Sequence, residues 1–258
     1  MKKTFLLFVT LGILLSGYAQ NDTLIITAKD VNTSVLRPGT HRWLVYFQNG
    51  NDSGRKSYSI WNRTISFEQY QGKDVIAIRQ RWDSYDTITH TVYSVSDRKT
   101  FQPYYQESWW KGRGTVKVDM LKKTIDFQGK LLSDEDTARS LKRIWTAFKS
   151  SVDQYTLNWH LDLETFPILP YKEGRTFGIN FYELASLPAA LQYYTVTGST
   201  KLKGYNDTEI DCWTLVHTSP NNKETFFISK KTKEVLKLEQ EFNGRYRFKV
   251  KLSFSDDH

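Results

Sequence analysis

The sequence Arg-Tyr-Arg-Phe-Lys-Val-Lys-Leu-Ser-Phe, from Arg245 to Phe254, is the stretch that decides the fold. Hydrophobic and polar residues alternate through it without a break. Such period-2 alternation predicts a β-strand with one face against an apolar core and the other face in water. The residues expected in the core are Tyr246, Phe248, Val250, Leu252 and Phe254, and those expected in water are Arg245, Arg247, Lys249, Lys251 and Ser253. A strand of this kind requires a sheet beside it.

The turn before this strand, Phe242-Asn243-Gly244, decides which residues lie opposite one another in the last hairpin. Asn-Gly alone favours a two-residue turn, which would place Phe242 opposite Arg245. We predict instead a three-residue loop with Gly244 left-handed, because it pairs residues of opposite charge and keeps apolar residues together. The expected pairs are Glu241 with Arg245, Glu239 with Arg247, Leu238 with Phe248 and Leu236 with Val250. Lys249 and Lys251 are left without an expected partner.

The chain upstream of this hairpin consists of short hydrophobic stretches separated by closely spaced turn signals. This pattern is typical of an antiparallel meander. We therefore predict a mainly β fold, a curved antiparallel sheet or half-barrel. Along these strands, Trp61, Ile65 and Phe67 are expected on one face, and Ile76, Ile78 and Trp82 together on another. The expected strands are 43–47, 57–70, 75–82, 87–95, 101–110, 115–120, 124–127, 176–182 and 192–203.

One main helix is predicted at about 133–150. Ser133 suits its N-cap, and three acidic residues follow in the first turn, where carboxylates stabilise the helix dipole. Its apolar stripe, at i, i+3, i+4 and i+7, is Leu141, Ile144, Trp145 and Phe148. This spacing predicts a helix that covers a sheet or joins two parts of one.

The expected organisation is a single β-rich domain over residues 20–258. A pattern in the sequence favours two similar β halves within it, 40–130 and 165–254, bridged by the helix. The run from Tyr93 to Thr100 and the run from Phe226 to Lys233 both consist of a strand ending in Val-Ser or Ile-Ser and then a polar, basic turn. Repeated patterns of this kind indicate related structural units.

Residues 1–19 have the composition of a signal peptide. Lys2 and Lys3 precede an apolar segment from Phe5 to Leu15, and Gly17-Tyr18-Ala19 places small residues where signal peptidase cleaves. We expect cleavage after Ala19 and a periplasmic or secreted bacterial protein. No second long apolar run follows, so no integral membrane span is expected after cleavage.

Charge and cysteine content narrow the classes of partner and of functional site that the protein can have. The net charge is +8, but the basic residues are spread along strands, and an exported protein rarely meets nucleic acid, so no nucleic-acid partner is expected. Cys212 is the only cysteine, which excludes an internal disulfide. Its strand-like surroundings indicate a buried structural thiol and not a nucleophile.

Three groups of motifs resemble a family of exported bacterial proteins of unknown function. They are the turn Asp97-Arg98-Lys99-Thr100-Phe101-Gln102-Pro103, the segment from Phe166 to Phe177, and the closing set Val196-x-Gly198, Cys212-Trp213 and Phe227-Ile228-Ser229-Lys230-Lys231-Thr232. The resemblance covers about residues 85–252, and Phe227 stands where the family more often has tryptophan. It implies a curved antiparallel sheet wrapped on a helix, similar to periplasmic lipoprotein-carrier half-barrels. The family has no established active site, so the resemblance transfers no catalytic residue.

The residues themselves point to no catalytic site, metal site or cofactor. His160 and Asp162 form the only close histidine–carboxylate pair, and a single pair is a weak metal signal. It is expected to be exposed on a strand or turn. Asp83 and Asp86 lie in a turn that favours aspartate for conformational reasons. The chain has no nucleophile elbow, P-loop or paired zinc motif.

Aromatic residues are the other candidates for a site. Trp109 and Trp110 are adjacent on an expected strand, so one should face the core and the other should not. Tyr104 and Tyr105 lie just upstream, and Trp213 follows Cys212. These five residues are the candidate ligand-binding residues, because an exposed indole beside tyrosine can stack on a sugar ring or contact a lipid. The alternative is that the paired tryptophans are simply covered by other parts of the fold.

Two functional classes remain, with a third beside them. The first is a non-enzymatic envelope protein that binds an apolar or amphipathic ligand, such as a lipid or lipoprotein, in the concave side of its sheet. The second is a carbohydrate-binding or glycan-processing protein that uses exposed aromatics and a carboxylate pair. The third is a structural partner of another envelope protein. A continuous apolar cavity would favour the first class, and exposed aromatics beside carboxylates would favour the second. The oligomeric state has no signature in the sequence.

Overall fold

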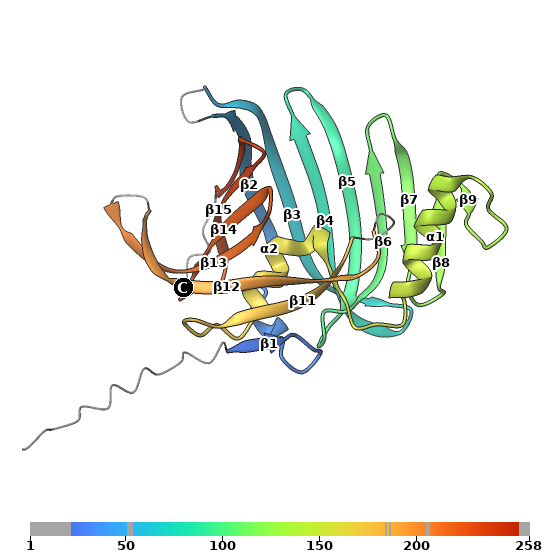
Figure 1. Ribbon diagram of the computed structural model, residues 1–258, viewed down its shortest axis with the longest axis horizontal. Helices are drawn as coiled ribbons and strands as arrows, with labels where there is room; N and C mark the ends of the chain where they lie inside the picture. The colour runs from blue at the N-terminus through green and yellow to red at the C-terminus, as the bar shows by residue number, and fades with distance from the viewer. Residues whose placement is uncertain (1–21, 51–53, 184, 186, 205–206, 253–258) are drawn as a thin grey trace, which may run out of the picture.

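A single curved sheet forms most of the molecule, and it is antiparallel except where β1 and β10 pair with β11 (Figure 1). This computed structural model describes residues 22–50, 54–183, 185, 187–204 and 207–252, so the expected signal peptide lies outside the described residues. The strand order is β1-β11-β12-β13-β14-β15-β16-β2-β3-β4-β5-β6-β7-β8-β9, and β10 pairs with β11 beside this path. The path ends at β1 and β9, which do not pair with each other within the described residues. The predicted curved, non-closed sheet is confirmed.

The strands match the expected meander closely from β2 to β8. Their bounds are β1 Thr23–Ile25, β2 Gly39–Asn49, β3 Lys56–Tyr70, β4 Lys73–Ser84, β5 Thr87–Asp97, β6 Pro103–Trp110, β7 Gly114–Asp119, β8 Thr124–Phe127, β9 Lys130–Leu131, β10 Leu157–Asn158, β11 Thr176–Tyr182, β12 Ala190–Lys203, β13 Glu209–Ser219, β14 Asn222–Ser229, β15 Val235–Phe242 and β16 Arg245–Lys251.

The main helix, α1 (Arg139–Ser151), is shorter than predicted. Ser133 does not cap it. The Ser133 N–H donates instead to Asp136 Oδ2 at 2.8 Å, which closes a separate turn, and the N-cap is Ala138 with no side-chain hydrogen bond. The same residue types serve turns and caps, which explains the error. The apolar stripe is confirmed, since Ile144 and Phe148 are buried against the strands β7 and β8.

The orientation predicted for β16 is wrong. Lys249 and Lys251 are each only 3% exposed, whereas Leu252 is 50% exposed. The period of two is present, but the basic residues face the concave side. On the convex side Phe248 stacks on Tyr46 of β2, with 4.9 Å between ring centroids. The two lysines are buried because the concave side contains carboxylates that neutralise them.

The predicted three-residue hairpin loop is also wrong. Phe242 pairs with Arg245, and the turn is the two-residue Asn243-Gly244 with both residues at positive φ, 50° and 71°. Such a type I′ turn matches the natural twist of a hairpin. Glu241 therefore lies opposite Tyr246, Glu239 opposite Phe248 and Leu238 opposite Lys249, and the expected ion pairs do not form. Backbone twist, and not charge pairing, decided the register.

An inner segment fills part of the concave side of the sheet. We use this name for residues 157–168, which comprise β10, the 3₁₀ turn η2 (Trp159–Leu161), the short helix α2 (Asp162–Thr165) and the 3₁₀ turn η3 (Phe166–Ile168). Figure 1 shows α2 in the hollow of the curved sheet. The fully buried Leu161 and Phe166 of the inner segment belong to the large core cluster, whose strand residues come from β11 to β15 and from β2 to β4. This segment brings polar residues into the interior beside its apolar anchors.

Candidate functional site

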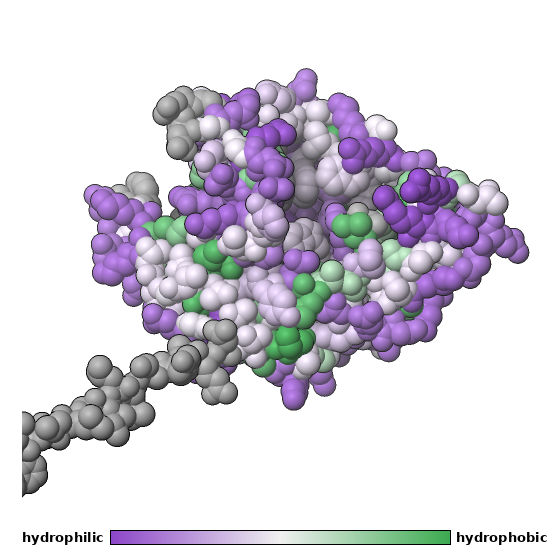
Figure 2. All heavy atoms as spheres, viewed as in Figure 1, coloured by the Kyte–Doolittle hydropathy of each residue, from purple (hydrophilic) through white to green (hydrophobic). Residues whose placement is uncertain are grey.

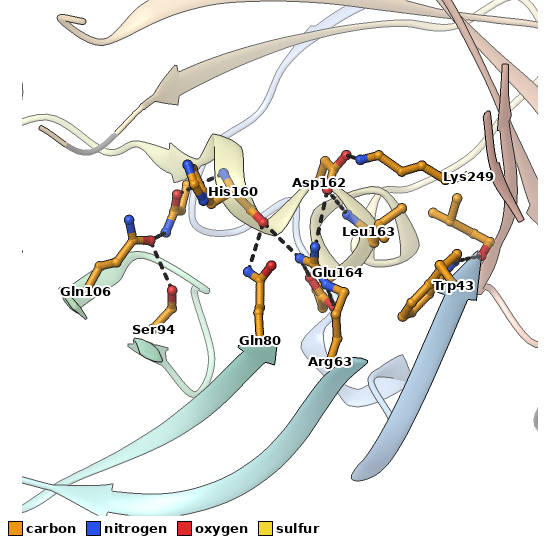
Figure 3. Close-up of polar contacts among 12 residues, drawn as sticks. Trp43, Arg63, Gln80, Ser94, Gln106, His160, Asp162, Leu163, Glu164 and Lys249 are labelled. Carbon is orange, nitrogen blue, oxygen red and sulfur yellow. Dashed lines mark hydrogen bonds and ion pairs between the residues drawn. The ribbon is translucent and has the colours of Figure 1, made fainter. Parts of the chain in front are cut away.

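The inner segment is fastened to the sheet by a buried ion pair. Arg63 of β3 donates from Nε to Glu164 Oε1 at 2.8 Å and from Nη2 to Glu164 Oε2, and both side chains are almost fully buried, at 1% and 2% exposed (Figure 3). Arg63 Nη2 also donates to the His160 carbonyl at 2.8 Å, where Gln80 Nε2 of β4 donates as well at 3.2 Å. The bidentate geometry fixes the segment against β3 and β4.

The two buried lysines of β16 also form ion pairs. We use the name polar layer for the residues of these pairs, which are Arg63, Glu164, Lys249, Asp162, Lys251 and Glu234. Lys249 Nζ forms an ion pair with Asp162 Oδ2 of the inner segment, as Figure 3 shows. Lys251 Nζ pairs with Glu234 and donates to His41 Nδ1 at 3.0 Å. Burial lowers the pKa of Lys249 to about 8 although Asp162 opposes this shift. A buried charge is tolerated only with such a partner.

A pocket of about 230 Å³ lies beside this layer on the concave side. We call it the tryptophan pocket. Its aromatic wall is Trp61, Trp82, Trp110, Trp159, Tyr194 and Phe226, and its polar residues are Arg63, His160, Asp162, Glu183, Glu224, Arg247 and Lys249. In Figure 2 the concave side is hollowed, with pale side chains inside the hollow and violet, hydrophilic ones around it. The pocket therefore joins an aromatic surface to ionic groups.

The aromatic wall is built by cross-strand packing. Trp61 of β3 and Trp82 of β4 are paired residues whose rings stack 3.8 Å apart at 5°. Trp110 of β6 stands edge-on to Trp82 at 5.3 Å and 89°, and its other neighbour, His90, stacks on it at 3.6 Å. Because the rings support one another, their orientation is set before any ligand binds.

The histidines near the pocket are neutral at pH 7. Burial lowers the pKa of His160 to about 4, with Arg63 adding to the effect, and burial likewise lowers the pKa of His90 to about 4. His90 Nδ1 donates to the Trp109 carbonyl at 2.8 Å, which leaves Nε2 as an unprotonated acceptor. Within the described residues, no three His, Cys, Asp or Glu side chains are placed to hold a metal ion.

Glu224 of β14 and Arg247 of β16 also line the pocket. Burial raises the pKa of Glu224, against the attraction of Arg247 and Lys249. Its carboxyl accepts from Gln240 Nε2 at 2.8 Å and from Tyr194 Oη at 3.5 Å. Arg247 makes no hydrogen bond or ion pair with any described residue, and its Nε is buried without an acceptor.

Comparison with known families identifies the chain. Residues 42–252, most of its length, match the model of the family described as "Protein of unknown function (DUF3108)". The chain belongs to the DUF3108 family. No curated protein sequence matches it. Among solved structures, it is similar to the crystal structure of a beta-barrel-like protein of domain of unknown function DUF1849 from Brucella abortus. That likeness has 8% sequence identity and a TM-score of 0.33, and covers 86% of this chain and 100% of that one.

Two of the motifs that indicated the family form tight turns in this DUF3108 chain. Asp97 Oδ1 accepts from the N–H groups of Lys99 and Thr100 at 2.9 and 2.7 Å. Ser229 Oγ accepts from the N–H of Thr232 at 3.0 Å. These two motifs therefore shape turns between strands, and none of the motif residues lines the tryptophan pocket. No helix in the described part of the DUF3108 chain is long and apolar enough to cross a membrane.

Of the five aromatic residues suggested by the DUF3108 sequence, Trp110 alone lines the tryptophan pocket. Trp109 follows the alternation of β6 and pairs with Thr91 and Thr115 on its neighbouring strands. The hydroxyl of Tyr104 donates to Asp97 Oδ2 at 2.6 Å, and that of Tyr105 donates to Glu107 at 3.0 Å.

Trp213 lies apart from the tryptophan pocket. Its ring stacks on Tyr171 with 6.2 Å between centroids, and Lys230 Nζ lies 4.2 Å from the ring centroid. These contacts hold the indole among the side chains at the edge of the large core cluster. The predicted residues thus occupy several separate places in the DUF3108 fold.

Sequence reasoning missed most of the pocket. Trp61 and Trp82 were assigned only to faces of their strands, and Arg247 and Lys249 were expected in water. The available signal was a charged residue on an otherwise apolar face, as in Trp61-x-Arg63-x-Ile65. A buried charge at such a position implies a partner elsewhere in the chain. Here that partner is Glu164, whose place the strand pattern could not reveal.

The predicted exposure of the His160–Asp162 pair is wrong. Both residues are only partly accessible, and Asp162 holds Lys249 and lies 3.8 Å from Arg63. Burial raises the pKa of Asp162, but the combined attraction of Lys249 and Arg63 outweighs this and leaves the pKa lowered. Phe67 lies on the same face of β3 as Trp61 and Ile65, as expected, but it is 39% exposed, whereas Arg63 on that face is fully buried.

Proposed function

We propose that this DUF3108 protein is an exported, non-enzymatic envelope protein that binds a small amphipathic ligand in the tryptophan pocket. The ligand would lay a flat or apolar part on the indoles and direct a polar part to the ionic residues. The proposal concerns the concave side of the sheet, where a lipid or lipoprotein-like ligand was expected from the sequence.

The observation that carries the proposal is the mixed lining of the pocket. Trp82, Trp110 and Trp159 remain partly accessible there, and they lie beside Asp162, Lys249, Glu224 and Arg247. Ligand sites are commonly aromatic concavities with a few placed polar groups. A purely apolar ligand would leave the Arg247 guanidinium dehydrated without a partner, which is unfavourable.

The volume of the pocket supports a small ligand or one part of a larger one. At about 230 Å³ it is below the roughly 300–1,000 Å³ of most drug-sized sites. It accommodates a headgroup or one ring. An acyl chain would extend beyond it, through the open side of the hollow seen in Figure 2.

Carbohydrate binding is the second candidate, and one observation favours it. Three carboxylates, Asp162, Glu183 and Glu224, lie among the tryptophans of the same pocket. Carboxylates accept hydrogen bonds from sugar hydroxyls, and indole faces pack on sugar rings. Glu224 and Asp162 also have pKa values shifted in opposite directions, as in glycan-processing enzymes.

Native mass spectrometry of protein purified from its own host tests the proposal. We expect an amphipathic ligand to copurify with the wild type and to be lost from Trp110→Ala. Its matched control, Trp109→Ala, changes the adjacent residue outside the pocket and should retain the ligand. Loss of a buried indole contact weakens binding by about 2 kcal/mol, roughly thirtyfold in Kd.

Two outcomes would contradict this proposal. Absence of any copurifying ligand together with specific binding to a glycan array would establish the carbohydrate alternative. Equal retention by Trp110→Ala and Trp109→Ala would show that the ligand binds elsewhere on the molecule.

A further inference from the structure

We infer that Arg247 is the anchor for an anionic group, a carboxylate or phosphate, on the ligand of the tryptophan pocket. This inference rests on the proposed function and deepens it, because it names the charge of the ligand. The ligand class is a ring or short apolar body carrying one acid group. An acidic sugar and an acidic amphiphile share this chemistry.

The cations of the pocket differ in how they are neutralised. Arg63 is bound bidentately by Glu164, and Lys249 forms its ion pair with Asp162. Both of these cations serve to hold the inner segment. Among the residues that the structure describes, Arg247 has neither a hydrogen-bond acceptor nor a carboxylate within ion-pair distance. It is therefore the cation of the pocket that remains for a ligand.

The environment of Arg247 makes this lack of a partner costly. Its side chain is partly buried in the pocket wall, and Nε has lost its water without gaining an acceptor. A buried unsatisfied donor costs about 1–3 kcal/mol, and more when the group is charged. Such groups are rare in folded proteins and call for an explanation. An anion bound by the guanidinium would neutralise the charge that this burial leaves without a partner.

Gln240, the residue opposite Arg247 on β15, adds a second unsatisfied atom. Its Nε2 donates to Glu224 Oε1 at 2.8 Å and to Asn222 Oδ1 at 2.6 Å. Its Oε1 is buried without a donor. Although Gln240 lies opposite Arg247, its Oε1 accepts no hydrogen bond from the guanidinium, which keeps its donors for a ligand.

The position of Arg247 suits a ligand that stacks on tryptophan. It shares the pocket with the half-exposed Trp82, Trp110 and Trp159. A guanidinium binds carboxylate or phosphate through two parallel hydrogen bonds, which orients the acid group as well as attracting it. Such a contact would fix the polar end while the indoles hold the ring.

Two matched pairs of probes test the inference in the full-length mature protein. Phenylacetate against 2-phenylacetamide represents the amphiphile, and glucuronate against glucose represents the sugar. The readouts are tryptophan fluorescence and the NMR signal of the Arg247 Nε–H group, assigned by its loss in Arg247→Gln. A charged hydrogen bond contributes about 1.5–3 kcal/mol, so the acid of at least one pair should bind roughly tenfold to a hundredfold tighter than its neutral partner.

Variants of two arginines on β16 provide the control. Arg247→Gln should abolish the preference for the acid, and Arg247→Lys should retain part of it. Arg245→Gln makes the same change of charge at an exposed position on the same strand and should preserve the preference in full. Because Arg247 has no protein partner to lose, its variants should fold normally.

The inference is overturned if neither acid shifts the Arg247 signal at millimolar concentration, or if acid and neutral probe bind equally. It is also overturned if the preference survives in Arg247→Gln. If the acid and its neutral partner bind equally and their binding depends on Trp110, Arg247 is not an anchor for an anion, but the proposed function stands. The same holds if native mass spectrometry finds a neutral ligand. Absence of any ligand in the pocket would overturn both.

Discussion

Replacing Arg63 with methionine tests how the inner segment is held in the concave side of the sheet. Arg63 lies at the centre of the polar layer, where it binds both carboxylate oxygens of Glu164 and the carbonyl of His160. Arg63→Met keeps the length and apolar stem of the side chain and removes the charge. Glu164, 2% exposed, would then be a buried carboxyl without a counterion.

The expected loss of stability follows from that unpaired carboxyl. Removing one partner of a buried pair costs about 3–5 kcal/mol, since the other partner stays dehydrated. The His160 carbonyl adds little to this cost, because Gln80 continues to donate to it at 3.2 Å. In a domain of this size the loss corresponds to a fall in Tm of roughly 6–20 °C.

The assay is urea denaturation followed by tryptophan fluorescence and circular dichroism. An unchanged m value, the slope of the unfolding free energy against urea concentration, would show that the variant loses stability and not compactness. The double variant Arg63→Met/Glu164→Leu removes the stranded charge, and we expect it to regain at least about 2 kcal/mol over the single variant. The control is Lys123→Met, because the Lys123–Asp153 pair is 57% and 74% exposed and should contribute less than about 1 kcal/mol.

Two results would refute this reasoning. One is a loss below about 1 kcal/mol for Arg63→Met, which would make the pair equivalent to the exposed control. The other is a double variant less stable than either single variant, which would show that the ion pair itself, and not an unpaired charge, dominates the energetics.

Three further predictions concern the turn, the histidines and the cysteine. Gly244→Ala should lower the free energy of unfolding by about 1 kcal/mol, because φ is 71° at this position. The added Cβ meets no atom within 4 Å, so the cost comes from the backbone conformation alone. An unchanged urea midpoint would argue against a left-handed residue. Folding lowers the pKa values of His90 and His160 from 6.5 to about 4, so the unfolded chain binds protons more tightly than the folded one. The stability that is present above pH 6.5 is therefore lost as the pH falls toward 4. The loss is at most about 3 kcal/mol for each histidine; denaturation at several pH values should show this slope, and His90→Gln or His160→Gln should reduce it. Cys212 should resist alkylation in the native protein and react in urea, because it is fully buried and burial raises its pKa to about 11; rapid native labelling would contradict this.

The parts of the fold that the sequence predicts are those set by local patterns. Alternation and turn residues placed most of the strands from β2 to β8, and the stripe through Ile144 and Phe148 identified the face that α1 buries. The start of α1 was misplaced because Ser133 and Asp136 close a turn with the same side-chain hydrogen bonds that cap helices. Local patterns therefore determined element types better than element ends.

The closing strand shows where local information ends. Its alternation correctly separates two faces, but alternation is symmetric about the plane of the sheet and does not say which face is inside. The burial of Lys249 and Lys251 depends on Asp162, 87 residues upstream of Lys249, and on Glu234, which directly precedes the neighbouring strand β15. Whether a lysine belongs inside is decided by these partners.

The sequence by itself determined a mainly β chain with one main helix, because periodicity and turn chemistry act between residues close in the chain. Only the tertiary structure decided the tryptophan pocket, since its lining comes from β3, β4, β6, the inner segment, β12, β14 and β16. The sequence alone indicated Trp110, whereas the unpaired guanidinium of Arg247 depends on tertiary contacts, in which Glu164 and Asp162 pair with Arg63 and Lys249. Ion pairing across the curved sheet, a long-range interaction, thus sets both the orientation of the last strand and the chemistry of the pocket.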